Sequence, residues 1–205
     1  AKKNNIKVIF YIAPQVWAWR EKRIYNIIKN VDHLAVVFPF EERLFKKYTD
    51  EVTYVGHPLA DNSKFNIKVA EYENKKIDVG IFPGSRDSEI KNNLHSMLNC
   101  IRLSKNEDIR TKNIKIFYSN ETSKRTILSL LPEDYATMLA DGKNIDSMAS
   151  CKKALTASGT ITLELALLNI QMVIMYKLSF ITFLIMRSLI KIKYIGLVNL
   201  VLGET

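Results

Sequence analysis

The sequence contains few of the residues that define several common protein classes. Its 205 residues include two cysteines, Cys100 and Cys151, which are too few for a disulfide framework or a cysteine-based zinc site. Seven glycines and five prolines exclude collagen-like and low-complexity chains. This sparing use of cysteine fits a reduced, cytosolic setting.

The common local motifs for nucleotide and metal binding are also absent. There is no GxGxxG and no GxxxxGK[ST] in the sequence. Neither HExxH nor CxxC occurs, and His33, His57 and His95 lie far apart along the chain. No local pattern supports a metal site, and we expect no metal and no cofactor.

Acidic residues are fewer than basic residues. The chain has 30 Lys and Arg against 21 Asp and Glu, a net charge of +9 that is spread along its length. This favours an anionic partner such as a phosphorylated ligand or an acidic membrane surface. Nucleic acid is the least favoured partner, because no recognition motif accompanies the charge.

Long uncharged apolar runs are missing as well. The nearest, residues 165–186, is interrupted by Lys177. We interpret it as a buried strand followed by an amphipathic helix rather than a membrane span. The last residues, NLVLGET, give no helix signal.

What the sequence does contain is an alternation of short apolar runs with amphipathic segments. Buried strands are predicted at residues 6–12, 33–38, 52–55, 77–82, 114–119, 154–157 and 172–176. Helices are predicted at residues 24–31, 41–48, 90–103, 123–131, 161–168 and 179–191. Such alternation predicts an α/β fold with parallel sheets, and the nearly continuous run 6–12 predicts a strand buried on both faces.

A polar stretch without clear periodicity, residues 61–76, is the candidate linker between two αβ series. Residues 1–60 form one series and residues 77–205 the other. The sequence therefore predicts two Rossmann-like lobes, of which the first lacks its start.

The first turn of interest, residues 83–86, joins a predicted strand to a helix with the sequence PGSR. Ligands of open α/β sheets bind at the carboxyl ends of strands, where helix N-termini present free N–H groups to phosphate. Arg86 would add a planar cation that grips a diphosphate through two parallel hydrogen bonds. The alternative is a tight turn in which a solvated Arg86 pairs with Glu89.

The second turn, residues 158–160, repeats the strand–turn–helix order. Gly159 permits close backbone approach, and Ser158 and Thr160 offer hydroxyl groups. Glu164 lies one helical turn after Thr160, where its carboxylate would accept both hydroxyls of a ribose. The alternative is that Ser158 or Thr160 caps the helix together with Glu164. Because both turns follow strands of one lobe, together they favour a nucleotide-diphosphate site.

Two further segments are less specific. Trp17, Trp19 and Arg20 would stack on a ligand or lie at an interface, although core packing between lobes is the commoner role of such tryptophans. The apolar segment 179–193 has basic residues near its end, which suits an anionic membrane surface. A core helix with a basic end is the alternative for that segment.

Several stretches taken together resemble the lipid-A-disaccharide synthase family. In chain order they are YIAPQVWAWREKRI, VVFPFEE, YVGHPLAD, FPGSRDSEI, ASGTITLELAL and YIGLVNLVLG. The resemblance spans nearly the whole chain, and PQVWAWR, GSRxxE and SGTxxLE are its most specific parts. It implies a glycosyltransferase of the two-lobed B type (GT-B), with an acceptor lobe followed by a UDP-sugar donor lobe that here lacks its end.

The resemblance also implies a reaction and a location. Members of the family transfer 2,3-diacylglucosamine from UDP to 2,3-diacylglucosamine 1-phosphate with inversion, which gives lipid A disaccharide phosphate and UDP. They serve lipopolysaccharide biosynthesis in Gram-negative bacteria. They work in the cytoplasm as peripheral proteins of the inner membrane, without a required metal, and the full-length enzyme is expected to be able to form a homodimer.

By the same resemblance, Arg86 stabilises the leaving diphosphate and Ser85 belongs to its turn. The backbone of the second turn holds phosphate, and Glu164 binds the ribose. These assignments are implied by the family motifs, and they agree with what the residue types offer an anionic leaving group.

The end of the chain offers one more candidate residue of the donor site. Asn199 matches a polar position that the family uses near the donor, and Val198 replaces the proline of many relatives. By the same resemblance, we expect the carboxylate that acts as general base to lie in a part of the family that precedes this chain, and Asp32 and Asp61 match no family motif. We therefore expect the chain to keep much of the UDP site but not to complete the transfer alone.

Two alternatives remain open. One is an enzyme similar to UDP-N-acetylglucosamine epimerase, or another two-lobed glycosyltransferase, for which a soluble sugar nucleotide would suffice. The other is a non-catalytic module that binds nucleotides or membrane surfaces. Activity without acyl chains would favour the first, and vesicle binding without a response to UDP would favour the second.

Overall fold

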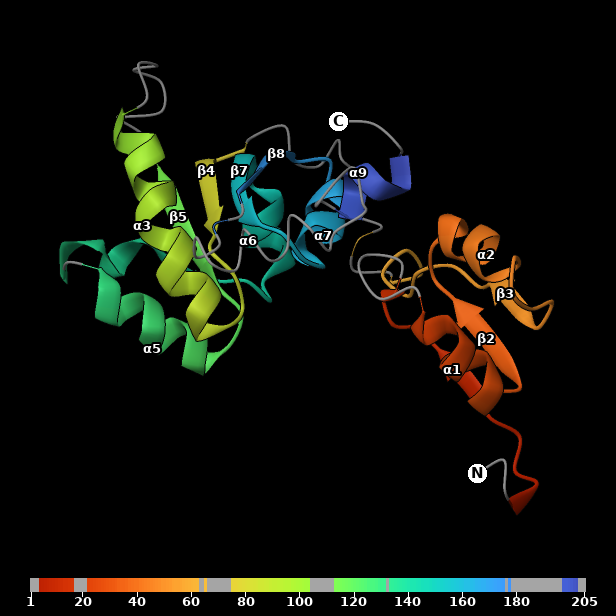
Figure 1. The fold of residues 1–205 in the computed structure, drawn as a ribbon. Helices are drawn as coiled ribbons and strands as arrows, with labels where there is room; N and C mark the ends of the chain where they lie inside the picture. Colours follow the sequence, from red (N-terminus) through yellow and green to blue (C-terminus); the bar gives the residue numbers. More distant parts are fainter. Residues whose placement is uncertain are drawn as a thin grey trace. The chain divides into compact units, whose positions relative to one another are not determined.

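The computed structural model describes residues 4–16, 22–62, 65, 75–103, 113–131, 133–175, 177 and 197–202. Contacts divide the chain into two compact units (Figure 1). The predicted linker lies largely outside the described residues, as do Trp17, Trp19, Arg20 and the predicted helix 179–191.

The first unit is a three-stranded parallel sheet with order β1-β2-β3. Its elements alternate as predicted. They are β1 (Ile9–Tyr11), α1 (Arg23–Asn30), β2 (His33–Val36), α2 (Pro39–Phe45) and β3 (Val52–Tyr54). The core of this unit joins apolar side chains of the helices to one face of the sheet, and it includes Ile24, Leu34, Val36, Phe45 and Val52.

Strand β1 differs from its prediction. The run 6–12 was predicted to be buried on both faces, but Ile9 and Tyr11 are 69% and 52% exposed. Phe10, between them, packs against the core. Because side chains alternate along a strand, only one face of this edge strand meets the helices. The prediction of two-sided burial is therefore wrong.

The second unit is a five-stranded parallel sheet with order β6-β5-β4-β7-β8. Its strands are β4 (Ile77–Phe82), β5 (Ile114–Tyr118), β6 (Leu139–Asp141), β7 (Cys151–Ala157) and β8 (Gln171–Met175). The chain runs from β4 outward through β5 to β6, returns to β7 on the other side of β4, and continues to β8. Both mixed α/β units thus have the parallel sheets that the alternation predicts.

Helices connect the strands of the second unit. They are α3 (Asp87–Leu103), α5 (Glu121–Leu130), the 3-10 helix η5 (Glu133–Met138), α6 (Ile145–Ala149) and α7 (Ile161–Leu167). The sequence predicted α3, α5 and α7 but not β6, η5 or α6. These missed elements are short, and α6 begins with a local cap in which the Asn144 side chain accepts a hydrogen bond from the Ser147 N–H.

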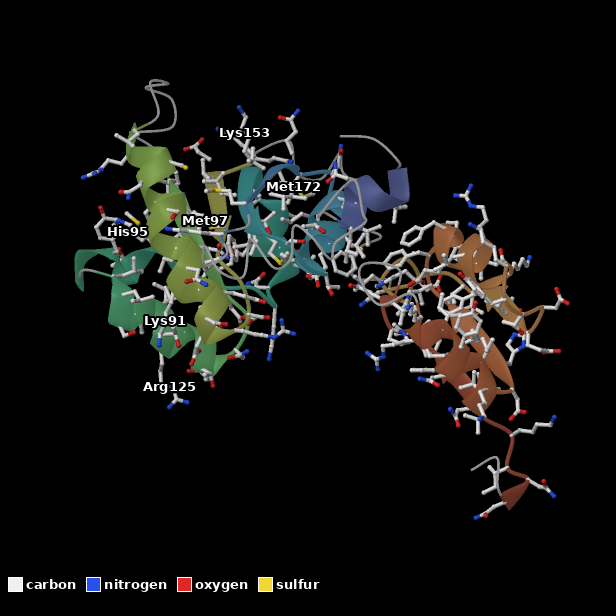
Figure 2. The ribbon with its side chains drawn as sticks, viewed as in Figure 1. Lys91, His95, Met97, Arg125, Lys153 and Met172 are labelled. Atoms are coloured by element: carbon white, nitrogen blue, oxygen red, sulfur yellow. The ribbon has the colours of Figure 1, made fainter. Side chains whose placement is uncertain are left out.

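Helix α3 covers the sheet with an apolar stripe. Ile90, Leu94 and Met97 recur at helical spacing and lie in the core of the unit. Figure 2 shows Met97 directed toward the sheet, whereas Lys91 and His95 project away from it. The stripe fixes the start of α3, and so the first turn, against the end of β4.

The last described helix is α9 (Leu197–Leu202), through which the division between the two units runs. The prediction that the final residues contain no helix is therefore wrong. Leucine and valine surround Asn199 here, and this apolar composition supports a helix even without a cap signal. None of the helices that the structure describes is both long enough and apolar enough to cross a membrane.

Candidate functional site

The two turns follow neighbouring strands in the middle of the second sheet. Phe82, at the end of β4, pairs with Thr156 near the end of β7. The connection after β4 leads to β5 on one side, and the connection after β7 leads to β8 on the other. Such a reversal of strand order is where open α/β sheets bind ligands, at the carboxyl ends of the strands. The geometry thus gathers Ser85, Arg86 and the second turn at one edge of the sheet.

In the first turn the side chain of Glu89 occupies the centre. Its Oε2 accepts hydrogen bonds from the backbone N–H groups of Ser85 at 3.1 Å and Arg86 at 3.4 Å. Its Oε1 accepts a hydrogen bond from Nη1 of Arg86 at 2.9 Å. The pairing of Arg86 with Glu89, considered above as the alternative, is therefore present. The Arg86 side chain is nonetheless 79% exposed, so its remaining donors face solvent.

Gly84 allows the carboxylate to sit so close. Its φ of +126° lies in the region that favours glycine, and a Cβ atom there would lie 2.9 Å from Oε2 of Glu89. A side chain at this position would both strain the backbone and collide with the carboxylate. The glycine therefore sets the shape of the first turn.

The second turn lacks the side-chain cap considered above for Thr160. Thr160 is the N-cap residue of α7, but its side chain makes no capping hydrogen bond. Instead the carbonyl of Gly159 accepts hydrogen bonds from the N–H and the Oγ1 hydroxyl of Thr162. A Cβ built on Gly159 would meet nothing within 4 Å, so the backbone here is open to approach. Ser158 is half-buried and Thr160 is exposed.

Glu164 is an acidic residue beside the second turn. It is half-buried in the first turn of α7, and no described residue forms a hydrogen bond or ion pair with its carboxylate. Burial raises the pKa of this carboxyl above its ordinary value, because desolvation disfavours the charged form. A half-buried acceptor that pairs with no described residue is suited to the hydroxyl groups of a ligand.

Asn93 is a residue of the site that the sequence reasoning missed. Asn93 is only 3% exposed. Its Nδ2 donates to the carbonyl of Pro83 at 3.1 Å, and its Oδ1 accepts from the N–H of Lys177 at 3.3 Å. Asn93 therefore ties the first turn to the chain that leaves β8. One signal was available, since this polar residue occupies a buried position in the stripe of α3.

Asn199 lies in α9 and is half-buried. By its contacts it belongs to the first unit. Asn199 is therefore not one of the residues that the second unit brings together at the carboxyl ends of its strands.

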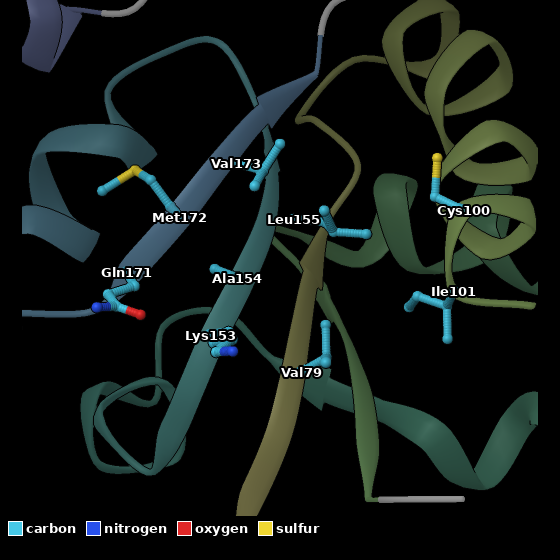
Figure 3. A pocket seen from close by; sticks show the side chains of 9 residues that line it. All are labelled: Val79, Cys100, Ile101, Lys153, Ala154, Leu155, Gln171, Met172 and Val173. Atoms are coloured by element: carbon cyan, nitrogen blue, oxygen red, sulfur yellow. The ribbon is translucent and has the colours of Figure 1, made fainter. Parts of the chain in front are cut away.

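A separate hollow of about 430 Å³ lies on the sheet of the second unit beside the end of α3 (Figure 3). Its lining is mostly apolar, with Val79, Leu155 and Met172 among the apolar residues and Lys153 and Gln171 as polar ones. None of the predicted site residues contributes to its described lining, which lies toward the amino ends of the strands. Among the residues that the structure describes, no three His, Cys, Asp or Glu side chains gather as a metal site would require.

Parallel α/β units, one of them with polar turns at a reversal of strand order, place the chain in the class of Rossmann-like proteins. A model of the lipid-A-disaccharide synthetase family matches residues 1–205, and the chain belongs to this family.

Individual relatives agree with the family match. The chain is 35% identical to the lipid-A-disaccharide synthase of Trichlorobacter lovleyi, 37% to that of Geobacter metallireducens and 38% to that of Coxiella burnetii. Each comparison covers 100% of this chain and 55% of the relative. The chain thus spans about half the length of the curated relatives that it matches.

Proposed function

We propose that this chain is part of a glycosyltransferase that makes lipid A disaccharide phosphate. The donor is UDP-2,3-diacylglucosamine and the acceptor is 2,3-diacylglucosamine 1-phosphate. The 6-hydroxyl oxygen of the acceptor forms a bond to the anomeric carbon of the donor, the bond from that carbon to UDP breaks with inversion, and a base takes the hydroxyl proton.

Residues 77–205 form the donor lobe in this proposal. Residues 1–60 belong to the acceptor lobe, and residues 61–76 link the two. The leaving group carries the charge of a diphosphate, so N–H dipoles and a guanidinium are the groups that stabilise its departure. The first turn offers Arg86 and two backbone N–H groups, and the second turn offers open backbone and hydroxyls.

Glu164 binds the ribose of UDP in the proposal. A carboxylate that is half-buried and unpaired among the described residues gains hydrogen bonds when two hydroxyls arrive. Asn199 contributes near the donor in the whole enzyme. The general base is assigned to no residue of this chain.

Both substrates carry acyl chains, which supports a place at the cytoplasmic surface of the inner membrane. The net charge of +9 is favourable for a surface of anionic lipids. A homodimer of the whole enzyme is a further part of the proposal.

The observation that carries the proposal is the family match over all 205 residues, combined with two polar turns at the ends of the adjacent strands β4 and β7. The family match supports the reaction class, and the strand order supports the location of the donor site.

Calorimetric titration with UDP tests the donor site. We expect Arg86→Ala to weaken UDP binding by about 1–3 kcal/mol, the scale of a hydrogen bond to a charged group. Arg102→Ala is the matched control, because it removes the same charge from the exposed far end of α3. ADP serves as the control ligand, and circular dichroism confirms folding of each variant.

Two results would contradict the proposal. One is a folded chain that binds UDP no better than ADP. The other is equal weakening by Arg86→Ala and Arg102→Ala, which would show that only the overall charge matters.

A further inference from the structure

The first turn already holds an anion that belongs to the chain itself. The carboxylate of Glu89 accepts hydrogen bonds from the backbone N–H groups of Ser85 and Arg86 and from the guanidinium of Arg86. These three donors are the same ones that the proposed function directs at the donor diphosphate. Each backbone N–H has one hydrogen, so it cannot fully serve the carboxylate and a phosphate oxygen at once.

The carboxylate of Glu89 lies where an incoming anion can displace it. The Glu89 side chain is 24% exposed and its partner Arg86 is 79% exposed, so an incoming anion reaches both. A phosphate would offer the N–H groups and the guanidinium acceptors of greater charge, while its repulsion of the carboxylate favours rotation of Glu89 toward solvent.

Glu41 in the first unit makes similar hydrogen bonds but has only a structural role. Glu41 accepts hydrogen bonds from the N–H groups of Val37 and Phe38, also between a strand and a helix. Glu41 is only 1% exposed, so a dissolved anion has little access to its carboxylate. Glu89 likewise accepts from two N–H groups between a strand and a helix, but its side chain is more accessible and pairs with the exposed Arg86.

We infer that Glu89 is an internal competitor of the donor diphosphate. It holds the first turn and Arg86 in place while the site is empty, and it gives up these donors when UDP or the UDP-sugar binds. This inference rests on the proposed function and assigns Glu89 as a positioning residue that sets the affinity for UDP. If the donors of a site are free for only a fraction of the time, the apparent affinity for the ligand is reduced in proportion to that fraction. A lower affinity for UDP also favours its release as a product.

Calorimetric titration of the full chain with UDP tests the inference. In Glu89→Gln the amide oxygen can still accept from the turn, but the competing charge is gone. We expect UDP to bind about three- to tenfold more tightly than to the unchanged chain. Asp87→Asn is the matched control, since Asp87 has the same charge two residues away but accepts a hydrogen bond from Thr126 on α5. We expect less than a twofold change for this control.

The inference is overturned if Glu89→Gln binds UDP no more tightly, or if Asp87→Asn gives the same gain. Carbon NMR of the unchanged chain provides a second measurement that needs no variant. On UDP saturation the side-chain carboxyl carbon of Glu89 should shift together with the amide signals of Ser85 and Arg86, while that of Asp87 stays in place. Amide shifts without a Glu89 carboxyl shift would overturn the inference.

These results separate the inference from the proposed function. If UDP binds and Arg86→Ala weakens it, but Glu89→Gln gives no gain, only the role of Glu89 falls. If no variant binds UDP, the proposed donor site and the role of Glu89 fall together.

Discussion

Two carboxylates at the sheet edge of the second unit have opposite surroundings. Glu89 accepts three hydrogen bonds within its own turn, whereas Glu164 has no partner among the described residues and sits half-buried. Sequence reasoning identified both positions, because each lies at a fixed short spacing from a turn. It could not decide which would be paired, since that depends on side-chain geometry and burial.

The half-buried carboxyl of Glu164, which pairs with no described residue, has a measurable effect on stability. Burial raises the pKa of its carboxyl in the folded chain, so the ionised form is disfavoured by folding. Above the folded pKa this penalty is complete, and it disappears as pH falls below the unfolded value near 4.5. We expect Glu164→Gln to raise the melting temperature at pH 7 but not at pH 3.5. Thermal unfolding followed by circular dichroism measures both.

The same variant should weaken UDP binding, since the amide is a poorer acceptor for the ribose hydroxyls. Glu121→Gln, at an exposed carboxylate on α5, serves as the control and should change neither property. An equal shift of the melting temperature at both pH values would show that ionisation of Glu164 is not the cause.

At the scale of the element, α3 does more than cover the sheet. Its stripe runs through Ile90, Leu94 and Met97, and Asn93 lies on the same side of the helix. The sequence predicted this helix from its apolar spacing but assigned Asn93 no role. The partners of Asn93 are a turn 10 residues before it and a segment 84 residues after it, and the second cannot be found from local pattern.

We expect Asn93→Ala to destabilise the chain by about 1–3 kcal/mol, because it leaves the carbonyl of Pro83 without its buried donor. Urea unfolding measures this loss. Asn92→Ala is the matched control, since Asn92 is the preceding residue of the same helix and is exposed. Similar stabilities of the two variants would contradict the role given to Asn93.

At the scale of the whole molecule, the alternation of strands and helices was sufficient to predict two sets of parallel strands. It did not predict strand order, because which strand pairs with β4 depends on contacts between distant residues. It also failed at β1, where a continuous apolar run was taken for two-sided burial. The number of apolar residues in a strand indicates how much apolar surface the strand has. It does not indicate how much of that surface is buried by other elements.

The exposed face of β1 leads to a prediction about association. Ile9 and Tyr11 are adjacent on one face of an edge strand and are 69% and 52% exposed. Exposed apolar side chains on an edge strand promote contact between chains. We expect the chain to self-associate with rising concentration, and we expect the double variant Ile9→Thr with Tyr11→Thr to reduce this in sedimentation experiments.

Leu103→Thr is the control for general surface hydrophobicity, because Leu103 is 70% exposed at the end of α3. An equal reduction by this control, or a chain that stays monomeric throughout, would contradict a special role for β1.

The pairing of β4 with β7 also determines when the candidate site comes into existence. The first turn lies between β4 and the helix that follows it. The second turn reaches its place only when β7 pairs with β4. These strands are far apart in the sequence, since Asp78 of β4 and Lys152 of β7, which form an ion pair, are separated by 74 residues. Closing so long a loop between parallel strands is a slow step in folding. Both halves of the site are encoded locally, yet a newly made chain would acquire the complete site only late in its folding.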